Sequence, residues 1–180
     1  MQGGVPNFGR KSREAAISQP HYARRMTYSI SGLDPAPFAH LAGLSDEDLA
    51  MHGAFRMIAD ACPGFPCRVT LDDAAPGEPL LLVNHVSHAN DNPYRASHAI
   101  FVGEGARLAA CFIDQIPPAL DRRILSLRGF DAAGMMCGAV LVQPGGADGA
   151  VRAMLADRLI DHIDAHNATR GCFAARVERY

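Results

Sequence analysis

Residues 124–142 read ILSLRGFDAAGMMCGAVLV and contain two apolar segments separated by a short turn. The segments Ile124–Asp131 and Met135–Val142 are joined by Ala132–Gly134. A three-residue connection that ends in glycine is typical of a β-hairpin, because the last position of the turn requires a positive φ. This stretch therefore predicts two antiparallel strands.

The C-terminal part of the chain predicts a second hairpin. Ile160–Asn167 and Cys172–Glu178 have the composition of strands, and Thr169–Gly171 supplies the turn between them. Strands that follow one another through such short turns pair antiparallel, because parallel strands need a long crossover connection.

The remaining elements are short. Leu80–Val83 is an unbroken apolar run, which favours a central strand buried on both faces. Further strands are predicted at Thr27–Ile30, Cys67–Leu71 and Ala99–Val102, and short helices after Ser45, over 119–123 and over 149–158, the last with Asp148 as its cap. We expect an α+β fold: a mostly antiparallel sheet of about seven strands with a few short helices packed on one face.

Composition excludes several classes of protein. The 180 residues include 17 basic and 19 acidic side chains, so the net charge is −2, whereas nucleic-acid-binding domains usually carry a strong basic excess. No apolar run approaches the roughly 20 residues that span a bilayer. We therefore expect neither a nucleic-acid nor a membrane partner, and the sequence leaves the oligomeric state open.

The first 25 residues differ from the rest of the chain. They contain five basic side chains, one acidic side chain and no apolar periodicity, so we expect residues 1–25 to be a basic, disordered extension and residues 26–180 a single domain. They also lack the apolar core of a secretory signal, which favours a cytoplasmic protein with reduced thiols. We accordingly expect no disulfide between Cys62 and Cys67.

The polar residues after the apolar run Leu80–Val83 form the first candidate site. They include Asn84, His85, Tyr94, Arg95 and His98. We expect residues 84–98 to form a loop over the middle of the sheet, where a rigid scaffold and a polar loop commonly build a pocket. Arg95 is the predicted cation for an anionic or carboxylate ligand, and His85 is a candidate general base. The alternative is a solvated loop whose side chains bond to its own backbone.

The closing hairpin carries the second candidate. Cys172 lies close in sequence to His166 and Arg170, and cations beside a thiol favour the thiolate, so Cys172 is a candidate nucleophile. The alternative is a buried structural cysteine. Arg128 is either a ligand-binding residue or, more simply, the partner of Asp131 in an internal ion pair.

Strand Ile160–Asn167 also carries the residues of a candidate metal site. His162, Asp164 and His166 share one face of their predicted strand, and two imidazoles with a carboxylate can hold a divalent metal. However, alternation with Ile163 and Ala165 is also what a half-exposed strand shows. We therefore expect a solvated sheet face here, no metal and no other cofactor. An imidazole from His85 or His88 would strengthen a metal site, but the sequence does not show whether either lies close.

Five stretches together resemble one bacterial family. They are MTYSISGLDPAPFAHL (26–41), PGFPCRVTLDDAAPGE (63–78), NPYRASHAIFV (92–102), LSLRGFDAAGMM (125–136) and HNATRGCFAARVER (166–179). In this order they resemble the family known as domain of unknown function 1203. The resemblance covers residues 26–180 and implies that Met26 is the family-like start. It also marks polar positions, Cys67, Arg68, Tyr94, Arg95, Arg128, Asp131, Asn167, Arg170 and Cys172, but it implies no activity.

The sequence thus leaves three functions open. The first is a binding domain for a small anionic or carboxylate ligand, with Asn84, His85, Tyr94, Arg95, His98, Arg128 and Arg170 as ligand-binding residues. The second is a thiol- or histidine-dependent hydrolase or transferase that uses Cys172 or His85. The third is a structural or partner-binding protein without a small-molecule site. Convergence of these residues in one cleft would favour the enzyme, and dispersal would favour the structural role.

Overall fold

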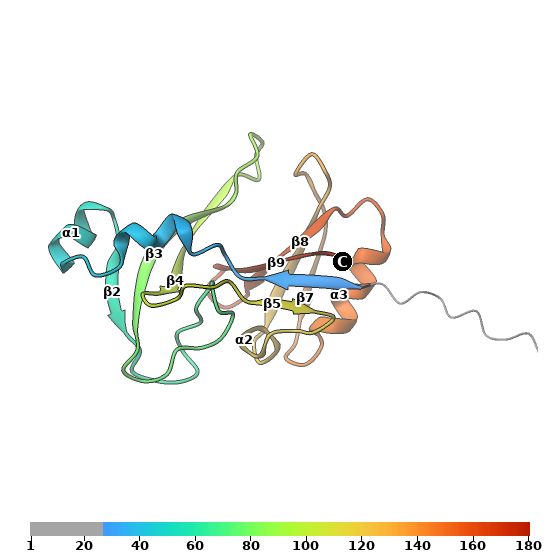
Figure 1. Cartoon of the computed structure of the whole chain (residues 1–180). Helices are drawn as coiled ribbons and strands as arrows, with labels where there is room; N and C mark the ends of the chain where they lie inside the picture. The colour runs from blue at the N-terminus through green and yellow to red at the C-terminus, as the bar shows by residue number, and fades with distance from the viewer. Residues whose placement is uncertain (1–26) are drawn as a thin grey trace, which may run out of the picture.

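The computed structural model describes residues 27–180, and these residues confirm the α+β class. In chain order the elements are β1 (Tyr28–Ser31), η1 (Ala36–Leu41), α1 (Asp46–Met51), β2 (Phe55–Ile58), β3 (Pro79–His88), β4 (Ala96–Gly103), β5 (Cys111–Ile113), α2 (Pro118–Asp121), β6 (Leu125–Phe130), β7 (Met136–Val142), α3 (Ala147–Ala156), β8 (His162–Asn167) and β9 (Phe173–Arg179). The strands form two antiparallel sheets rather than one (Figure 1).

The larger sheet, sheet A, has six strands in the order β5-β1-β9-β8-β6-β7. Both predicted hairpins are confirmed, because β6 pairs with β7 and β8 pairs with β9. Gly134 and Gly171 in the two turns have φ angles of +76° and +71°. Glycine adopts such angles without steric cost. The hairpin β8–β9 lies in the middle of sheet A.

The smaller sheet, sheet B, has the order β2-β3-β4. Its central strand β3 contains the apolar run Leu80–Val83, as predicted, but it extends to His88. Asn84 and His85 therefore lie inside a strand and not in a loop, and the expected loop 84–98 shrinks to residues 89–95. The pairing continues past the apolar run because β4 remains in register, with His85 opposite His98.

Three further details of the predicted pattern are wrong. Cys67–Leu71 is not a strand, because Leu71 has a φ of +55°, and Cys67 forms only an isolated bridge to β4. The short edge strands β2 and β5 were not predicted, since three or four residues carry little periodicity. Asp148 lies inside α3 instead of capping it, and its carboxylate accepts a hydrogen bond from the Tyr28 hydroxyl at 2.7 Å.

Each sheet has its own apolar core. One core joins sheet A to α3 and includes Leu127, Val151, Leu155 and Ile163. The other lies around sheet B, η1 and α1. In Figure 1, sheet B, sheet A and α3 follow one another across the molecule, so α3 and sheet B lie on opposite sides of sheet A.

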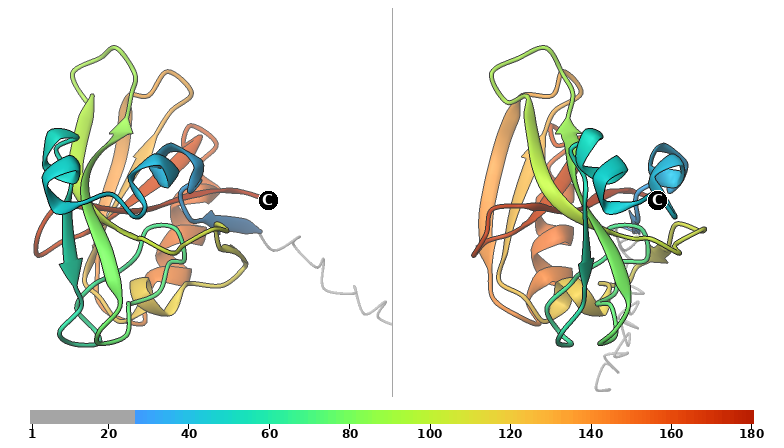
Figure 2. Two further views of the ribbon diagram at one scale, coloured as in Figure 1. Left: turned by 60° about the vertical axis from the view of Figure 1, so that its left-hand side comes forward. Right: turned by 90° about the vertical axis from the view of Figure 1, so that its left-hand side faces the viewer.

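The hairpin loops 89–95 and 131–135 project toward the same end of the molecule (Figure 2). They are joined by side-chain amides: Asn92 Nδ2 donates to Gly134 O at 2.9 Å, and Asn90 Nδ2 donates to Ala133 O at 3.3 Å. These bonds connect the end of sheet B to the end of sheet A.

Residues 1–26 lie outside the described part of the chain, so the predicted extension 1–25 and the start of the domain at Met26 stay predictions. Across residues 27–180, no helix has the length and apolar character needed to cross a membrane.

Candidate functional site

A layer of polar side chains fills the space between the two sheets. We call it the polar layer; its members are His85, His88 and His98 from sheet B, and Arg128, His162, Asp164, His166 and Arg176 from sheet A. Ring centroids of His98 and His166 are 5.0 Å apart, and His88 Nδ1 lies 3.9 Å from Asp164 Oδ2. Residues from distant parts of the chain therefore meet here.

Strand β8 explains why the layer forms. Its alternation sends Ile163 and Ala165 into the core with α3, and His162, Asp164 and His166 to the opposite face. The expected solvated face is wrong, because Asp164 is 1% exposed and His166 is 2% exposed. Sheet B covers this face, which no pattern within β8 itself could indicate.

Asp164 is held by an arginine. Arg176 on the neighbouring strand donates from Nε to Asp164 Oδ1 at 2.8 Å and from Nη2 to Oδ2 at 3.1 Å. Its Nη2 also donates to Ser87 O at 3.1 Å. Arg176 thus links the buried carboxylate of sheet A to the backbone of β3 beside His88.

Three histidines of the layer, His85, His98 and His166, have lowered pKa values and are therefore uncharged at neutral pH. Burial lowers the pKa of His166 to about 4, with the nearby positive charge of Arg128 as a further cause. Burial also lowers the pKa of His98 and of His85. Neutral imidazoles keep a free lone pair on one ring nitrogen, so they can accept protons or bind cations.

A cleft of about 810 Å³ opens beside this layer. Its lining includes four arginines, Arg68, Arg122, Arg123 and Arg170, together with His98, Cys172 and an apolar wall of Met57, Leu82, Phe101 and Ile124. The described lining contains no aspartate or glutamate. A cavity of this size and composition is typical of a site for a small organic molecule.

Arg68 is the most unusual residue in the cleft, since it is only 3% exposed. Its Nε donates to Phe173 O at 2.9 Å, its Nη2 lies 3.1 Å from Cys172 Sγ, and its Nη1 bonds to Pro66 O. Within residues 27–180 it has no carboxylate partner. Burial lowers the pKa of Arg68, whereas the neighbouring Cys172 raises it. Buried guanidinium groups are normally paired with an anion.

The other arginines of the cleft differ from Arg68. Arg123 Nη1 donates to Asp73 Oδ2 at 3.0 Å, and Arg122 Nη1 lies 3.6 Å from the same oxygen. Two cations therefore share one carboxylate, which leaves positive charge on this side of the cleft. Arg170 is exposed at the turn between β8 and β9.

Cys172 lines the same cleft and is half-buried. Besides Arg68, the side-chain amide of Asn167 donates to its sulfur at 3.5 Å. His98, another lining residue, lies 3.0 Å from Ser87 Oγ through its Nδ1. Donors beside a sulfur are found around nucleophilic cysteines, so the environment of Cys172 fits the predicted role.

The other predicted site residues are dispersed. Asn84 and His85 line a second cleft of about 580 Å³, together with Phe38 and His52. Arg95 lies in the 89–95 loop, where its Nη1 donates to Ala89 O at 2.6 Å.

Tyr94 and Arg128 also lie away from the predicted pocket. Tyr94 packs edge-on against Phe130, with ring centroids 6.1 Å apart. The expected Arg128–Asp131 ion pair is absent from the described residues, because Asp131 Oδ1 instead accepts the backbone N–H groups of Ala133 and Met135. Arg128 on β6 lies directly opposite Asp164 on the neighbouring strand β8, on the same face of sheet A.

Two important residues, Arg68 and His88, were not among the ligand-binding residues predicted from the sequence. Arg68 was marked as a polar position by the family resemblance, but without a role. His88 was one of several histidines in an expected loop. His88 lies beside Asp164 of β8 because the two sheets are in contact. No local sequence pattern predicts that contact.

Comparisons with known proteins identify the family of the chain and nothing more. No curated protein and no solved structure matches the chain. The family model described as "Protein of unknown function (DUF1203)" matches residues 64–179. This match covers most of the described residues, including the polar layer and all of the cleft lining except Met57, and the chain therefore belongs to the DUF1203 family.

Proposed function

We propose that the large cleft binds a small organic molecule with a carboxylate or phosphate group, and that Arg68 is the main anchor for that group. One observation carries the proposal: a guanidinium that is 3% exposed lines a cleft and has no carboxylate partner within residues 27–180. Leaving such a charge without a counter-ion is costly, and an anionic ligand would supply one.

The hydrogen-bonding capacity of Arg68 supports this role. A guanidinium has five N–H groups, and three of them are used by Phe173 O, Pro66 O and Cys172 Sγ. One N–H group on each terminal nitrogen remains for a ligand. Carboxylate and phosphate groups accept such paired donors, and each charge-assisted bond contributes about 1.5–3 kcal/mol.

The remaining lining indicates the rest of the ligand. Arg122, Arg123 and Arg170 add positive charge, and Met57, Leu82 and Phe101 add apolar surface. A molecule with an acidic head and an apolar body suits this combination. The ligand-binding role predicted for Arg170 and His98 is kept in this proposal, whereas Arg95 lines neither of the two large clefts.

The test is a binding screen of aliphatic and aromatic carboxylates and phosphomonoesters, followed by calorimetry on the full chain. For the strongest carboxylate ligand, Arg68→Lys should weaken binding at least tenfold, and Arg170→Ala should weaken it less. Arg158→Ala removes an exposed arginine outside the cleft and should leave the affinity unchanged.

A second measurement does not depend on the stability of the variants. The neutral amide analogue of the same ligand should bind the unaltered protein at least tenfold more weakly than the acid. Equal affinities for acid and amide, or equal affinities of Arg68→Lys and Arg158→Ala for the acid, would contradict the proposal.

The second candidate function is thiol-dependent hydrolysis or group transfer by Cys172. It is favoured by the two donors to the sulfur, Arg68 and Asn167, in the same cleft. A thiolate at Cys172 would itself be the counter-ion of Arg68. In that case Arg68 would not require an anionic ligand, so the comparison of the acid with its neutral amide also separates the two functions.

A further inference from the structure

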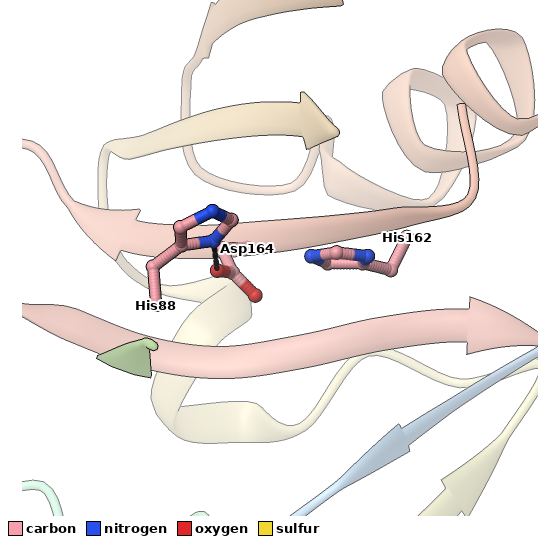
Figure 3. Close-up of side chains that lie close together, drawn as sticks. All are labelled: His88, His162 and Asp164. Atoms are coloured by element: carbon pink, nitrogen blue, oxygen red, sulfur yellow. Dashed lines mark ion pairs between the residues drawn. The ribbon is translucent and has the colours of Figure 1, made fainter. Parts of the chain in front are cut away.

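The polar layer contains three ligand-type side chains that point to one place, apart from both large clefts (Figure 3). They are His88 from the end of β3, and His162 and Asp164 from β8. One donor atom from each lies within 4.8 Å of the others, and all three residues are buried. Because β3 belongs to sheet B and β8 to sheet A, this cluster lies on the junction between the sheets.

The hydrogen bonds fix which nitrogen of each histidine carries the proton. His88 Nε2 lies 2.9 Å from the carbonyl oxygen of Gly134, which can only accept, so Nε2 holds the hydrogen. His162 Nδ1 lies 3.1 Å from the carboxylate of Asp161, so Nδ1 is the donor in that ring. The lone pairs of His88 Nδ1 and His162 Nε2 are therefore free.

These two nitrogens are the two buried side-chain atoms without a hydrogen-bond partner in the described chain. His88 is 3% exposed and His162 is 9% exposed, so solvent does not replace the missing partners. Buried polar atoms in native proteins are nearly always satisfied, and an exception requires an explanation such as a bound ion. Here both exceptions face the same carboxylate.

Asp164 retains capacity for a metal although it pairs with Arg176. A carboxylate has about four lone-pair positions, and Arg176 uses one on each oxygen. The Arg176 bonds also fix the orientation of the carboxylate, as the bonds to Gly134 O and Asp161 fix the two imidazoles. Such outer partners are typical of metal ligands.

We propose that His88, His162 and Asp164 bind one divalent first-row transition metal ion, of the class of Zn²⁺ and Fe²⁺, and thereby connect the two sheets. Two imidazoles and one carboxylate suit these ions, whereas Mg²⁺ and Ca²⁺ prefer ligands that are all oxygen. With metal–ligand bonds of about 2.0–2.2 Å, the three atoms must converge by roughly 1 Å, which side-chain rotation can provide.

This site differs from the one weighed from the sequence. His166 is not a ligand, because its Nδ1 lies 3.2 Å from Gly171 O and its ring packs against His98. His88 is the proposed ligand in place of His166, and the position of His88 next to Asp164 could not be predicted from the sequence. The expectation that no metal binds this strand is therefore replaced by a proposal that can be tested.

The first experiment uses the full chain without an affinity tag, stripped of metal by a chelator and titrated with ZnCl₂ in a calorimeter. We expect one equivalent of Zn²⁺ to bind with a Kd of micromolar or lower. Saturating Zn²⁺ should raise the Tm by at least about 5 °C, because the ion binds only the folded state. Mg²⁺ at the same concentration should have no effect.

Co²⁺ gives an independent measurement on the unaltered protein. It should produce visible absorption bands from a site with nitrogen and oxygen ligands, and Zn²⁺ should abolish them by displacement. Less than roughly 0.1 equivalent of bound Zn²⁺, together with no Co²⁺ bands, would overturn the proposal whatever the variants do.

Variants locate the site. His88→Gln/His162→Gln should lose the stoichiometric Zn²⁺, and Asp164→Asn should bind it at least tenfold more weakly. The control is His40→Gln/His52→Gln, which removes two exposed histidines whose rings lie 5.4 Å apart. Loss of Zn²⁺ in the control with retention in His88→Gln/His162→Gln would contradict the proposal. The anion cleft shares none of these residues, so the two proposals fail or succeed separately.

Discussion

The two faces of strand β8 are equally buried and chemically opposite. On one face, Ile163 and Ala165 are 0% exposed and pack into the core with α3. On the other face, Asp164 and His166 are 1% and 2% exposed and meet the histidines of sheet B. Burial alone therefore does not separate residues that stabilise the fold from residues that are available for chemistry.

The difference lies in what each face gains from burial. An apolar side chain gains free energy in proportion to the area that it removes from water. A buried polar side chain loses its hydrogen bonds to water. The bonds that it makes inside the protein do little more than offset this cost in free energy. The two unpartnered lone pairs of the polar layer are thus expected where a bound ion or ligand supplies the missing partner.

The largest effect is expected on the apolar face. Ile163→Ala should lower the free energy of unfolding by about 2–5 kcal/mol, because it leaves a cavity in a close-packed core. Chemical denaturation of the metal-free protein measures this loss. A loss below about 1 kcal/mol would show that burial of the apolar face of β8 does not stabilise the fold as proposed.

The next effect concerns the join between the two hairpin loops. Gly134 has a φ of +76°, and a Cβ atom there would lie 2.4 Å from Asn90 Nδ2. Gly134→Ala should therefore cost about 1–3 kcal/mol, from backbone strain and from displacement of Asn90. Gly53→Ala is the matched control, because Gly53 has a φ of +67° with open space around it. Equal costs for the two variants would show that the contact with Asn90 is unimportant.

Acid should weaken the ion pairs that Arg122 and Arg123 form with Asp73 at the cleft. Burial alone would raise the pKa of Asp73, but the bonds from Arg123 and the Gly64 N–H outweigh it, so the pKa lies below its usual value. A carboxyl group with a lowered pKa contributes stability above the unfolded value and loses it as pH falls below about 4.

Asp73→Asn should consequently destabilise the protein by about 1–3 kcal/mol at pH 7 and have little effect near pH 2. Unfolding curves across this pH range measure the difference. A difference that does not depend on pH would show that the charge of Asp73 is not what holds Arg122 and Arg123.

The smallest effect on stability is expected at Cys172. Cys172→Ser should change the free energy of unfolding by less than about 1 kcal/mol, since the residue is only half-buried. Mass spectrometry after brief treatment with iodoacetamide at pH 7 should nevertheless show faster alkylation of Cys172 than of the more exposed Cys62. Slower alkylation of Cys172 would count against the thiol-dependent function.

Much of the fold could be predicted from local sequence. The hairpin turns at Gly134 and Gly171, the cap at Ser45 and the central strand at Leu80–Val83 all follow from turn chemistry, capping or apolar runs. The division into two sheets could not be predicted, because it depends on the short edge strands β2 and β5 and on the interruption at Leu71.

The candidate site was less predictable than the fold. Cys172, His98 and Arg170 do line one cleft, but Arg68 joins them from a segment 104 residues away from Cys172 in the chain. His88 meets Asp164 in the same way. Both contacts arise from the approach of sheet B to sheet A, and periodicity within a single strand carries no information about that approach.

Without a bound metal ion, the polar layer should add little to the stability of the protein. Replacing His88, His162 and Asp164 with leucine and Arg176 with methionine would fill the same space with apolar side chains. In the presence of a chelator, the free energy of unfolding of this variant should lie within about 1 kcal/mol of the parent or above it, because buried ionic groups gain little over apolar ones. A loss greater than about 3 kcal/mol would contradict the claim and would show that the layer holds the two sheets together by itself.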